Sequence, residues 1–146
     1  MVSKQWVDDD QFLVVMGDNL YSENDIETIS RRIDKFCYVA AYKSEHPERY
    51  GVLEVLDGML KKIEEKPAHP KSNLVNTGLY KLTPEIFTHL IDLKKSPRGE
   101  FELTDAITHL AGLGRVKIYV LKDYWLDMST KEDLPKIEEK IKQLGL

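Results

Sequence analysis

Two aspartates each follow a short apolar segment, and they are the first candidates for chemistry. Asp18 comes just after the apolar run Phe12 to Met16, and Asp127 follows Trp125-Leu126. If both segments are strands, each carboxylate lies where a strand ends, which is where open α/β sheets bind ligands. One Mg²⁺ could then be held by both, since this ion takes one or two carboxylates together with phosphate oxygens.

Both aspartates also have an ordinary interpretation. Gly, Asp and Asn are the commonest turn-forming residues, so Gly17-Asp18-Asn19 taken alone is more typical of a plain turn than of a ligand site. Asp127 could be one residue of a strand-to-helix connection. Spacing alone does not show that the two carboxylates converge.

A second set of candidates lies in the middle of the chain. Lys66 offers a point charge for a phosphate, and Glu65 can accept hydrogen bonds from sugar hydroxyls. The alternative is that Lys61 to Lys66 is a solvated run of charges. Asn76-Thr77-Gly78 interrupts an apolar segment, and a glycine inside a strand marks a bulge or a close approach of ligand to backbone.

Other motifs are assigned no chemistry. Gly112-Leu113-Gly114-Arg115 follows a helix and precedes a strand, which is the reverse of a phosphate-binding loop, so it is interpreted as helix termination. Cys37 is expected to pack as a small apolar residue. The four histidines lack the spacing of metal ligands: His46, His69, His89 and His109.

Composition excludes several classes of protein. With 146 residues and a net charge of −4, the chain has no basic field for nucleic acid. Its longest apolar run, Phe12 to Met16, is too short to span a membrane. Met1 to Asp10 lacks the apolar core of a signal peptide, and a single cysteine excludes an internal disulfide. These features predict a cytoplasmic location.

The elements that would position the candidates alternate between strands and helices. Strands are predicted near 12–16, 37–43, 50–56, 60–65, 74–82 and 116–127, with Asp57-Gly58 as a hairpin turn. Helices are predicted from Asn24, from Thr83, over 102–113 and from Thr130, the last burying Leu134, Ile137, Ile141 and Leu144. The first helix would bury Ile26, Ile29, Ile33 and Phe36. Residues 1–146 are therefore expected to form a single α/β domain with a mostly parallel mixed sheet, an inserted β-hairpin and flanking helices.

The order of the motifs resembles one family along nearly the whole chain. The chain resembles the sugar-1-phosphate nucleotidylyltransferases, most closely the glucose-1-phosphate thymidylyl- and uridylyltransferases. The resemblance rests on Phe12 to Asn19, Tyr50-Gly51-Val52, Glu64 to Pro67, Asn76 to Tyr80, Glu102 to Ile107 and Trp125-Leu126-Asp127. It implies a partial Rossmann-like nucleotide-diphospho-sugar transferase fold.

The resemblance also implies an activity and a set of roles. That family joins a sugar 1-phosphate to a nucleoside triphosphate, here dTTP or UTP, and releases pyrophosphate. By matching motif, Asp18 and Asp127 would hold the catalytic Mg²⁺, and Lys66 would contact the sugar phosphate. The sugar pocket would be lined by Gly51, Glu65, Asn76 and Gly78.

Two departures from the family pattern matter. Ser129 stands where the family usually has glycine, which adds a side chain beside Asp127. The family also opens with a strand and a Gly-rich loop that bind the triphosphate, whereas Met1 lies only a few residues before the Asp18 strand. The sugar-phosphate side is present in the sequence and the nucleotide side is not.

This departure leads to three hypotheses and one structural expectation. The chain is either a truncated enzyme, weak or inactive alone, or a non-catalytic sugar-phosphate-binding or regulatory subunit that assembles with a longer partner. A third interpretation is a stand-alone sugar-phosphate binder. The strand from Phe12 to Asp18 would have an unpaired edge, which predicts a homo-oligomer or association with an N-terminal partner.

Overall fold

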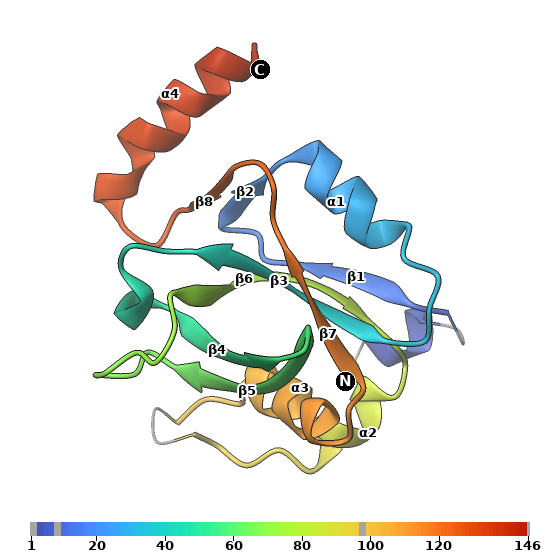
Figure 1. Ribbon diagram of the computed structural model, residues 1–146. Coiled ribbons are helices and arrows are strands. Elements are labelled where there is room, and N and C mark those ends of the chain that lie inside the picture. Colours follow the sequence, from blue (N-terminus) through green and yellow to red (C-terminus); the bar gives the residue numbers. More distant parts are fainter. Residues whose placement is uncertain (1–2, 8–9, 97–98, 146) are drawn as a thin grey trace.

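The computed structural model describes residues 3–7, 10–96 and 99–145. Its centre is a six-stranded sheet in the order β1-β6-β3-β7-β5-β4, and a separate two-stranded ladder joins β2 to β8 (Figure 1). The strands are β1 (Phe12–Val15), β2 (Asn19–Tyr21), β3 (Cys37–Lys43), β4 (Gly51–Leu56), β5 (Met59–Glu65), β6 (Leu74–Leu82), β7 (Val116–Val120) and β8 (Trp125–Asp127). The helices are α1 (Glu23–Ser30), α2 (Ile86–Ile91), α3 (Leu103–Gly112) and α4 (Leu134–Leu144), with short 3-10 turns at Ser3–Trp6, Pro47–Arg49 and Lys131–Asp133.

The mixed α/β class and the inserted hairpin are confirmed, but the expected majority of parallel pairings is wrong. Within the described residues, β3 and β7 pair in parallel and the other five pairings of the large sheet are antiparallel. The reason is the place of β6, which runs antiparallel between β1 and β3. β1, α1 and β3 form a strand-helix-strand unit. Its two strands run parallel, with β6 between them.

The hairpin β4–β5 pairs with two other strands of the sheet, β6 and β7. Its turn has positive φ at both central residues, 51° at Asp57 and 75° at Gly58, which is the primed geometry predicted from this dipeptide. Val52 of β4 pairs with Val75 of β6, while Met59 of β5 pairs with Lys117 of β7. The hairpin thereby closes the sheet on itself and brings the ends of β4 and β5 close to β6.

Apolar side chains form a core on each side of the sheet. One core packs Val39, Ile63 and Tyr80 against Ile107 and Leu110 of α3. The other packs Ile29 of α1, Leu79 and Trp125 together on the opposite side. Cys37 is 1% exposed, as its apolar role predicts. Every helix in the described residues is too short or too polar to cross a membrane.

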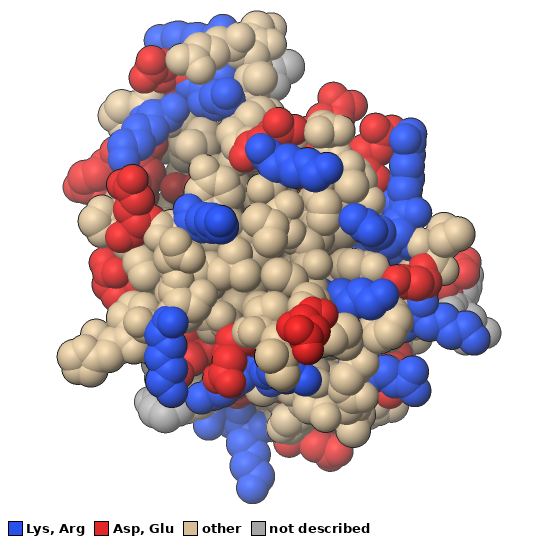
Figure 2. All heavy atoms as spheres, viewed as in Figure 1, with Lys and Arg blue, Asp and Glu red and all other residues tan. Residues whose placement is uncertain are grey.

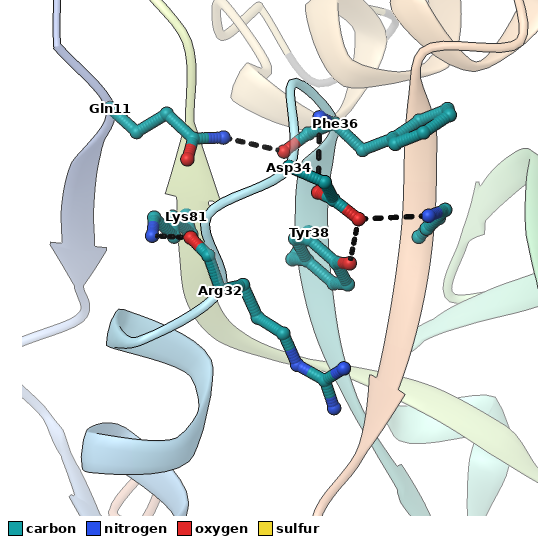
Figure 3. Close-up of polar contacts among 7 residues, drawn as sticks. Gln11, Arg32, Asp34, Phe36, Tyr38 and Lys81 are labelled. Carbon is teal, nitrogen blue, oxygen red and sulfur yellow. Dashed lines mark hydrogen bonds and ion pairs between the residues drawn. The ribbon is translucent and has the colours of Figure 1, made fainter.

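The turn after α1 differs from the prediction. The helix ends at Ser30, so Ile33 lies in the following turn and is 97% exposed instead of buried. The buried Lys81 stabilises the chain where the helix ends, because its Nζ donates to the Ser30 carbonyl at 2.6 Å. The same Nζ also donates to the Arg32 carbonyl (Figure 3). Asp34 then holds the turn by accepting from Tyr38 Oη at 2.8 Å (Figure 3).

The last helix is only partly packed. The capping box of Thr130 and Asp133 is present, as predicted, and Ile137 is buried. Leu134 and Leu144, which were expected to face inward, are 48% and 38% exposed. The helix projects from the body of the molecule (Figure 1), so only part of its apolar face meets the core.

A buried carboxylate fixes the loop that leads into β8. Asp25, fully buried in α1, accepts from Tyr119 Oη (2.8 Å) and from the backbone N–H groups of Lys122 and Asp123 (3.0 Å each). Burial alone would raise the pKa of Asp25, but these hydrogen bonds outweigh it and hold the pKa below its ordinary value of 3.8. Asp25 therefore sets the position from which β8 starts.

Replacing Asp25 with Asn should destabilise the fold by about 3 kcal/mol, because an amide hydrogen would face backbone N–H donors. The lowered pKa means that the stabilisation is complete above about pH 4 and is lost as the pH falls through the folded-state value. The difference between wild type and Asp25→Asn in denaturant melts should therefore shrink below pH 4. Asp57→Asn, in the exposed hairpin turn, is the matched control and should change stability by less than about 0.5 kcal/mol. Equal effects of both substitutions would contradict the role of Asp25.

Candidate functional site

All the residues singled out from the sequence line one open hollow of about 260 Å³. They lie in the β1–β2 connection, on β4, β5, β6 and β8, and directly after β5. They are Asp18, Gly51, Glu65, Lys66, Asn76, Gly78 and Asp127. Residues that are distant in the sequence are thus brought together, and none of the predicted set lies elsewhere.

The main chains that carry the two aspartates are neighbours at the β2–β8 ladder. Asn19 and Asp127 are register partners, and the backbone N–H of Met128 donates to the Asp18 carbonyl at 2.9 Å. Burial is the largest cause that raises the pKa of Tyr21. The nearby Tyr80, Asp18 and Asp127 raise the same pKa further. Tyr21 therefore stays neutral and donates from its hydroxyl to the Thr77 carbonyl at 2.6 Å.

Each aspartate uses one carboxylate oxygen within the protein. Asn19 Nδ2 donates to Asp18 Oδ1 at 2.7 Å, and the Ser129 hydroxyl donates to Asp127 Oδ2. Among the described residues, Asp18 Oδ2 and Asp127 Oδ1 accept no hydrogen bond. Ser129, which stands where the family usually has glycine, therefore occupies one oxygen of Asp127 and leaves the other available.

This donor set fits a hard cation. The described residues contain no cluster of three or more His, Cys, Asp or Glu side chains that could hold a metal. A zinc site would need such a set. Two carboxylates are enough for Mg²⁺, whose remaining ligands are waters and substrate phosphates. Asp18 and Asp127 are the residues that could hold it.

Lys66 enters the hollow from a strained backbone. Its φ is +44°, a left-handed conformation that is unusual for a side-chain-bearing residue and costs of order 1 kcal/mol. The backbone N–H of Lys66 donates to the Tyr50 carbonyl at 3.0 Å, which fixes this turn. Strain of this kind clusters at functional sites, and here it directs the chain away from β5 at the edge of the hollow.

Gly51 leaves room for the Glu65 carboxylate. The two residues are partners in the β4–β5 ladder. A Cβ at Gly51 would lie 2.8 Å from Glu65 Oε2 and 2.9 Å from Ile63 Cγ2. Any side chain at position 51 would therefore push Glu65 out of place.

The bulge in β6 forms the floor of the hollow. Gly78 has φ of +78°, and a Cβ there would lie 2.7 Å from Met16 Cγ. The Asn76 amide bridges this bulge, because its Nδ2 donates to Tyr80 Oη (2.7 Å) and its Oδ1 accepts from Gly78 N–H (3.2 Å). Burial raises the pKa of Tyr80 to about 12, so its hydroxyl remains protonated.

Sequence reasoning missed several side chains that line the same hollow. Arg49 lies 5.8 Å from the Tyr50 ring centre and 3.8 Å from Asp133, and it adds a second cation beside Lys66. Trp125 packs its ring against Tyr50, with centroids 5.2 Å apart. Arg49 lies two residues before Gly51, and Trp125 stands in the motif Trp125-Leu126-Asp127. Neither residue type by itself indicates a site, since arginine and aromatic residues are common at surfaces and in cores alike.

Comparison with known proteins agrees with the sequence resemblance. Residues 1–143 match the family model described as nucleotidyl transferase. The chain is 40% identical over 136 residues to the bifunctional protein GlmU of Methanocaldococcus jannaschii, covering 92% of this chain and 32% of that protein. It is 34% identical over 141 residues to the UTP–glucose-1-phosphate uridylyltransferase AglF of Haloferax volcanii, covering 92% of this chain and 58% of that protein.

A solved structure gives the same answer for the fold. An apo UDP-glucose pyrophosphorylase matches with a TM-score of 0.84 at 26% identity, over 99% of this chain and 58% of its own. The fold is thus that of the nucleotide-diphospho-sugar transferases. The chain belongs to the nucleotidyl transferase family, and its relatives include sugar-1-phosphate nucleotidyltransferases. It spans less than two thirds of each of these three proteins.

Replacing Gly78 with Ala should destabilise the protein by about 2–4 kcal/mol, because the new Cβ combines a left-handed backbone with an overlap on Met16. Denaturant melts would measure the loss. Gly17→Ala, in the neighbouring loop, is the control: its Cβ would meet nothing within 4 Å, so stability should stay within about 0.5 kcal/mol. A Gly78→Ala variant as stable as Gly17→Ala would mean that the bulge is not constrained.

Proposed function

We propose that these residues form the sugar-phosphate side of a sugar-1-phosphate nucleotidyltransferase site. The observation that carries the proposal is the convergence of seven residues from distant segments in one hollow. The relatives support the reaction class, because AglF is named for UTP and glucose 1-phosphate. The reaction joins a sugar 1-phosphate to a nucleoside triphosphate, UTP or dTTP, and releases pyrophosphate.

Each side chain has a role that its chemistry supports. Lys66 binds and orients the sugar phosphate, whose oxygen attacks the α-phosphorus of the triphosphate, with pyrophosphate leaving on the opposite side. Glu65 and Asn76 hold the sugar hydroxyls, while Gly51 and Gly78 let the sugar approach the backbone. Asp18 and Asp127 hold Mg²⁺. When bound, the ion neutralises the charge that develops on the phosphates.

The family's Gly-rich triphosphate loop is not in these 146 residues. We therefore expect the chain to need a triphosphate-binding segment from elsewhere in a longer chain or from a partner, and to turn over weakly or not at all alone. The second candidate is a non-catalytic sugar-phosphate-binding or regulatory subunit. It is favoured by the same observation, since the sugar side is complete without the loop. In that case sugar phosphate binds, and supplying the segment restores no turnover.

The edge of β1 is the proposed contact with a partner or a second copy. Within the described residues β1 pairs only with β6, and Val15 is 48% exposed. Unpaired apolar strand edges readily pair with another chain. On the face shown in Figure 2, acidic and basic side chains are interspersed, which supports a partner other than nucleic acid. We place the protein in the cytoplasm, which suits its single buried cysteine.

Replacing Lys66 with Ala should weaken glucose 1-phosphate binding about tenfold, the effect of losing one hydrogen bond to a charged group. Isothermal titration of the 146-residue chain would measure this, and pyrophosphate release with UTP or dTTP and Mg²⁺ should stay near background. Lys61→Ala is the matched control from the same charge run, outside the hollow, and should bind as wild type does. Equal loss in both variants would favour a solvated charge run, and robust turnover by the 146 residues alone would refute the need for another segment.

Replacing Val15 with Lys should reduce self-association, because a charge on an exposed strand edge opposes pairing. Sedimentation velocity at micromolar concentration should show the wild-type chain associated and the variant monomeric. Val120→Lys provides the control, since Val120 is 39% exposed on β7, inside the sheet. A wild-type chain that sediments as a clean monomer would count against homo-oligomerisation through this edge.

A further inference from the structure

The Asn19 side chain links Trp125 to Asp18. Trp125 Nε1 donates to Asn19 Oδ1 at 2.6 Å, and Asn19 Nδ2 donates to Asp18 Oδ1 at 2.7 Å. Trp125 is only 9% exposed and Asn19 is half-buried, so the bond between them is partly shielded from water, whereas the bond to Asp18 is exposed. The three side chains form a continuous chain of hydrogen bonds that ends on a carboxylate of the proposed metal site.

The direction of this chain is fixed by chemistry. An indole N–H can only donate, so the carbonyl end of the Asn19 amide must face Trp125. The amide NH₂ must then face Asp18, whose ionised carboxylate can only accept. Each group thus determines the orientation of the next, and the amide has one arrangement that satisfies both neighbours.

The indole itself is held firmly. Trp125 begins β8 and pairs with Tyr21 in the ladder, and its ring lies against Tyr42 and Tyr50, with centroids 5.6 Å and 5.2 Å away. Burial in this aromatic cluster leaves the N–H little freedom. Trp125 is therefore the rigid end of the chain, and Asp18 is the exposed end.

We propose that Trp125 and Asn19 are positioning residues that orient the Asp18 carboxylate for a divalent cation. This rests on the proposed function, in which Asp18 and Asp127 hold Mg²⁺. Asn19 binds Oδ1 of Asp18, which leaves Oδ2 available at the hollow that both Asp18 and Asp127 line. Outer hydrogen bonds of this kind orient a metal ligand.

Strand pairing alone does not account for these bonds. The β2–β8 ladder aligns the main chains of Asn19 and Asp127 whatever side chain stands at position 19. An asparagine in a simple turn satisfies its amide with its own neighbouring backbone. Here both ends of the amide are used by side chains, and one of those side chains is the candidate ligand.

The first experiment is a double-mutant cycle on Mn²⁺ affinity, measured from free Mn²⁺ by electron paramagnetic resonance. Trp125→Phe keeps an aromatic ring and removes the N–H, and Asn19→Ala removes the amide. Each should raise the Mn²⁺ dissociation constant about tenfold. The double variant should be no weaker than Asn19→Ala alone, because the indole acts on Asp18 only through Asn19. Trp6→Phe, at a tryptophan that is 78% exposed, is the matched control.

The second experiment needs no enzymatic activity. The chain has two tryptophans, so Trp6→Phe assigns the indole N–H signal of Trp125 in a proton–nitrogen NMR spectrum. Mg²⁺ titration should shift that signal in wild type, and should leave it in place in Asp18→Asn and Asn19→Ala. Unchanged backbone signals elsewhere in the spectrum would show that the variants remain folded.

The outcomes separate the two proposals. Ion binding that depends on Asp18 but is unaffected by Asn19→Ala and Trp125→Phe would overturn the positioning role and leave the metal site standing. Additive effects in the cycle would overturn the route through Asn19. A wild-type chain that binds no ion, or binds it equally well as Asp18→Asn, would overturn the proposed metal site and the positioning role with it.

Discussion

The site depends on the short ladder between β2 and β8. Three residue pairs join segments from opposite ends of the chain, and one of them places Asn19 beside Asp127. Two carboxylates brought together repel each other, so the ladder must be held by other interactions. Trp125 and Asn19 supply one set, and the buried Asp25 supplies another by fixing the loop before β8. Stability of the fold and placement of the candidate ligands therefore depend on the same few hydrogen bonds.

β6 has the corresponding role for the sugar side of the hollow. It lies between β1 and β3, meets β4 at Val75, and carries both Asn76 and Gly78. Its bulge at Gly78 lets the strand approach Met16, the residue just after β1, more closely than any side chain would allow. Because β6 contacts both β1, which leads to Asp18, and the hairpin, a change in its register would move most of the hollow at once.

Local chemistry explains which parts could be predicted from the sequence. The Asp57-Gly58 turn, the capping box at Thr130 and the break at Gly78 depend on neighbouring residues, and all three are present. The direction of β6 and the exposure of Ile33 depend on long-range pairing and on Lys81, which local patterns do not contain. The candidate site residues could be chosen by type and motif order, but their convergence could not. Asn19 and Trp125 were missed because they are typical of a turn and a core.

The charges of the hollow explain why this part of a site would need both an ion and further cations. The lining of the hollow includes the two aspartates Asp18 and Asp127 and two cations, Arg49 and Lys66. Arg49 is already paired with Asp133. The two neighbouring aspartates repel a sugar phosphate and a triphosphate unless their charge is offset, and electrostatic interactions are strong in a partly dehydrated site. In the proposed function, a divalent ion held by Asp18 and Asp127 would offset this charge and allow phosphate to bind beside them. The triphosphate, which carries more charge than the sugar phosphate, would still need cationic groups from another segment.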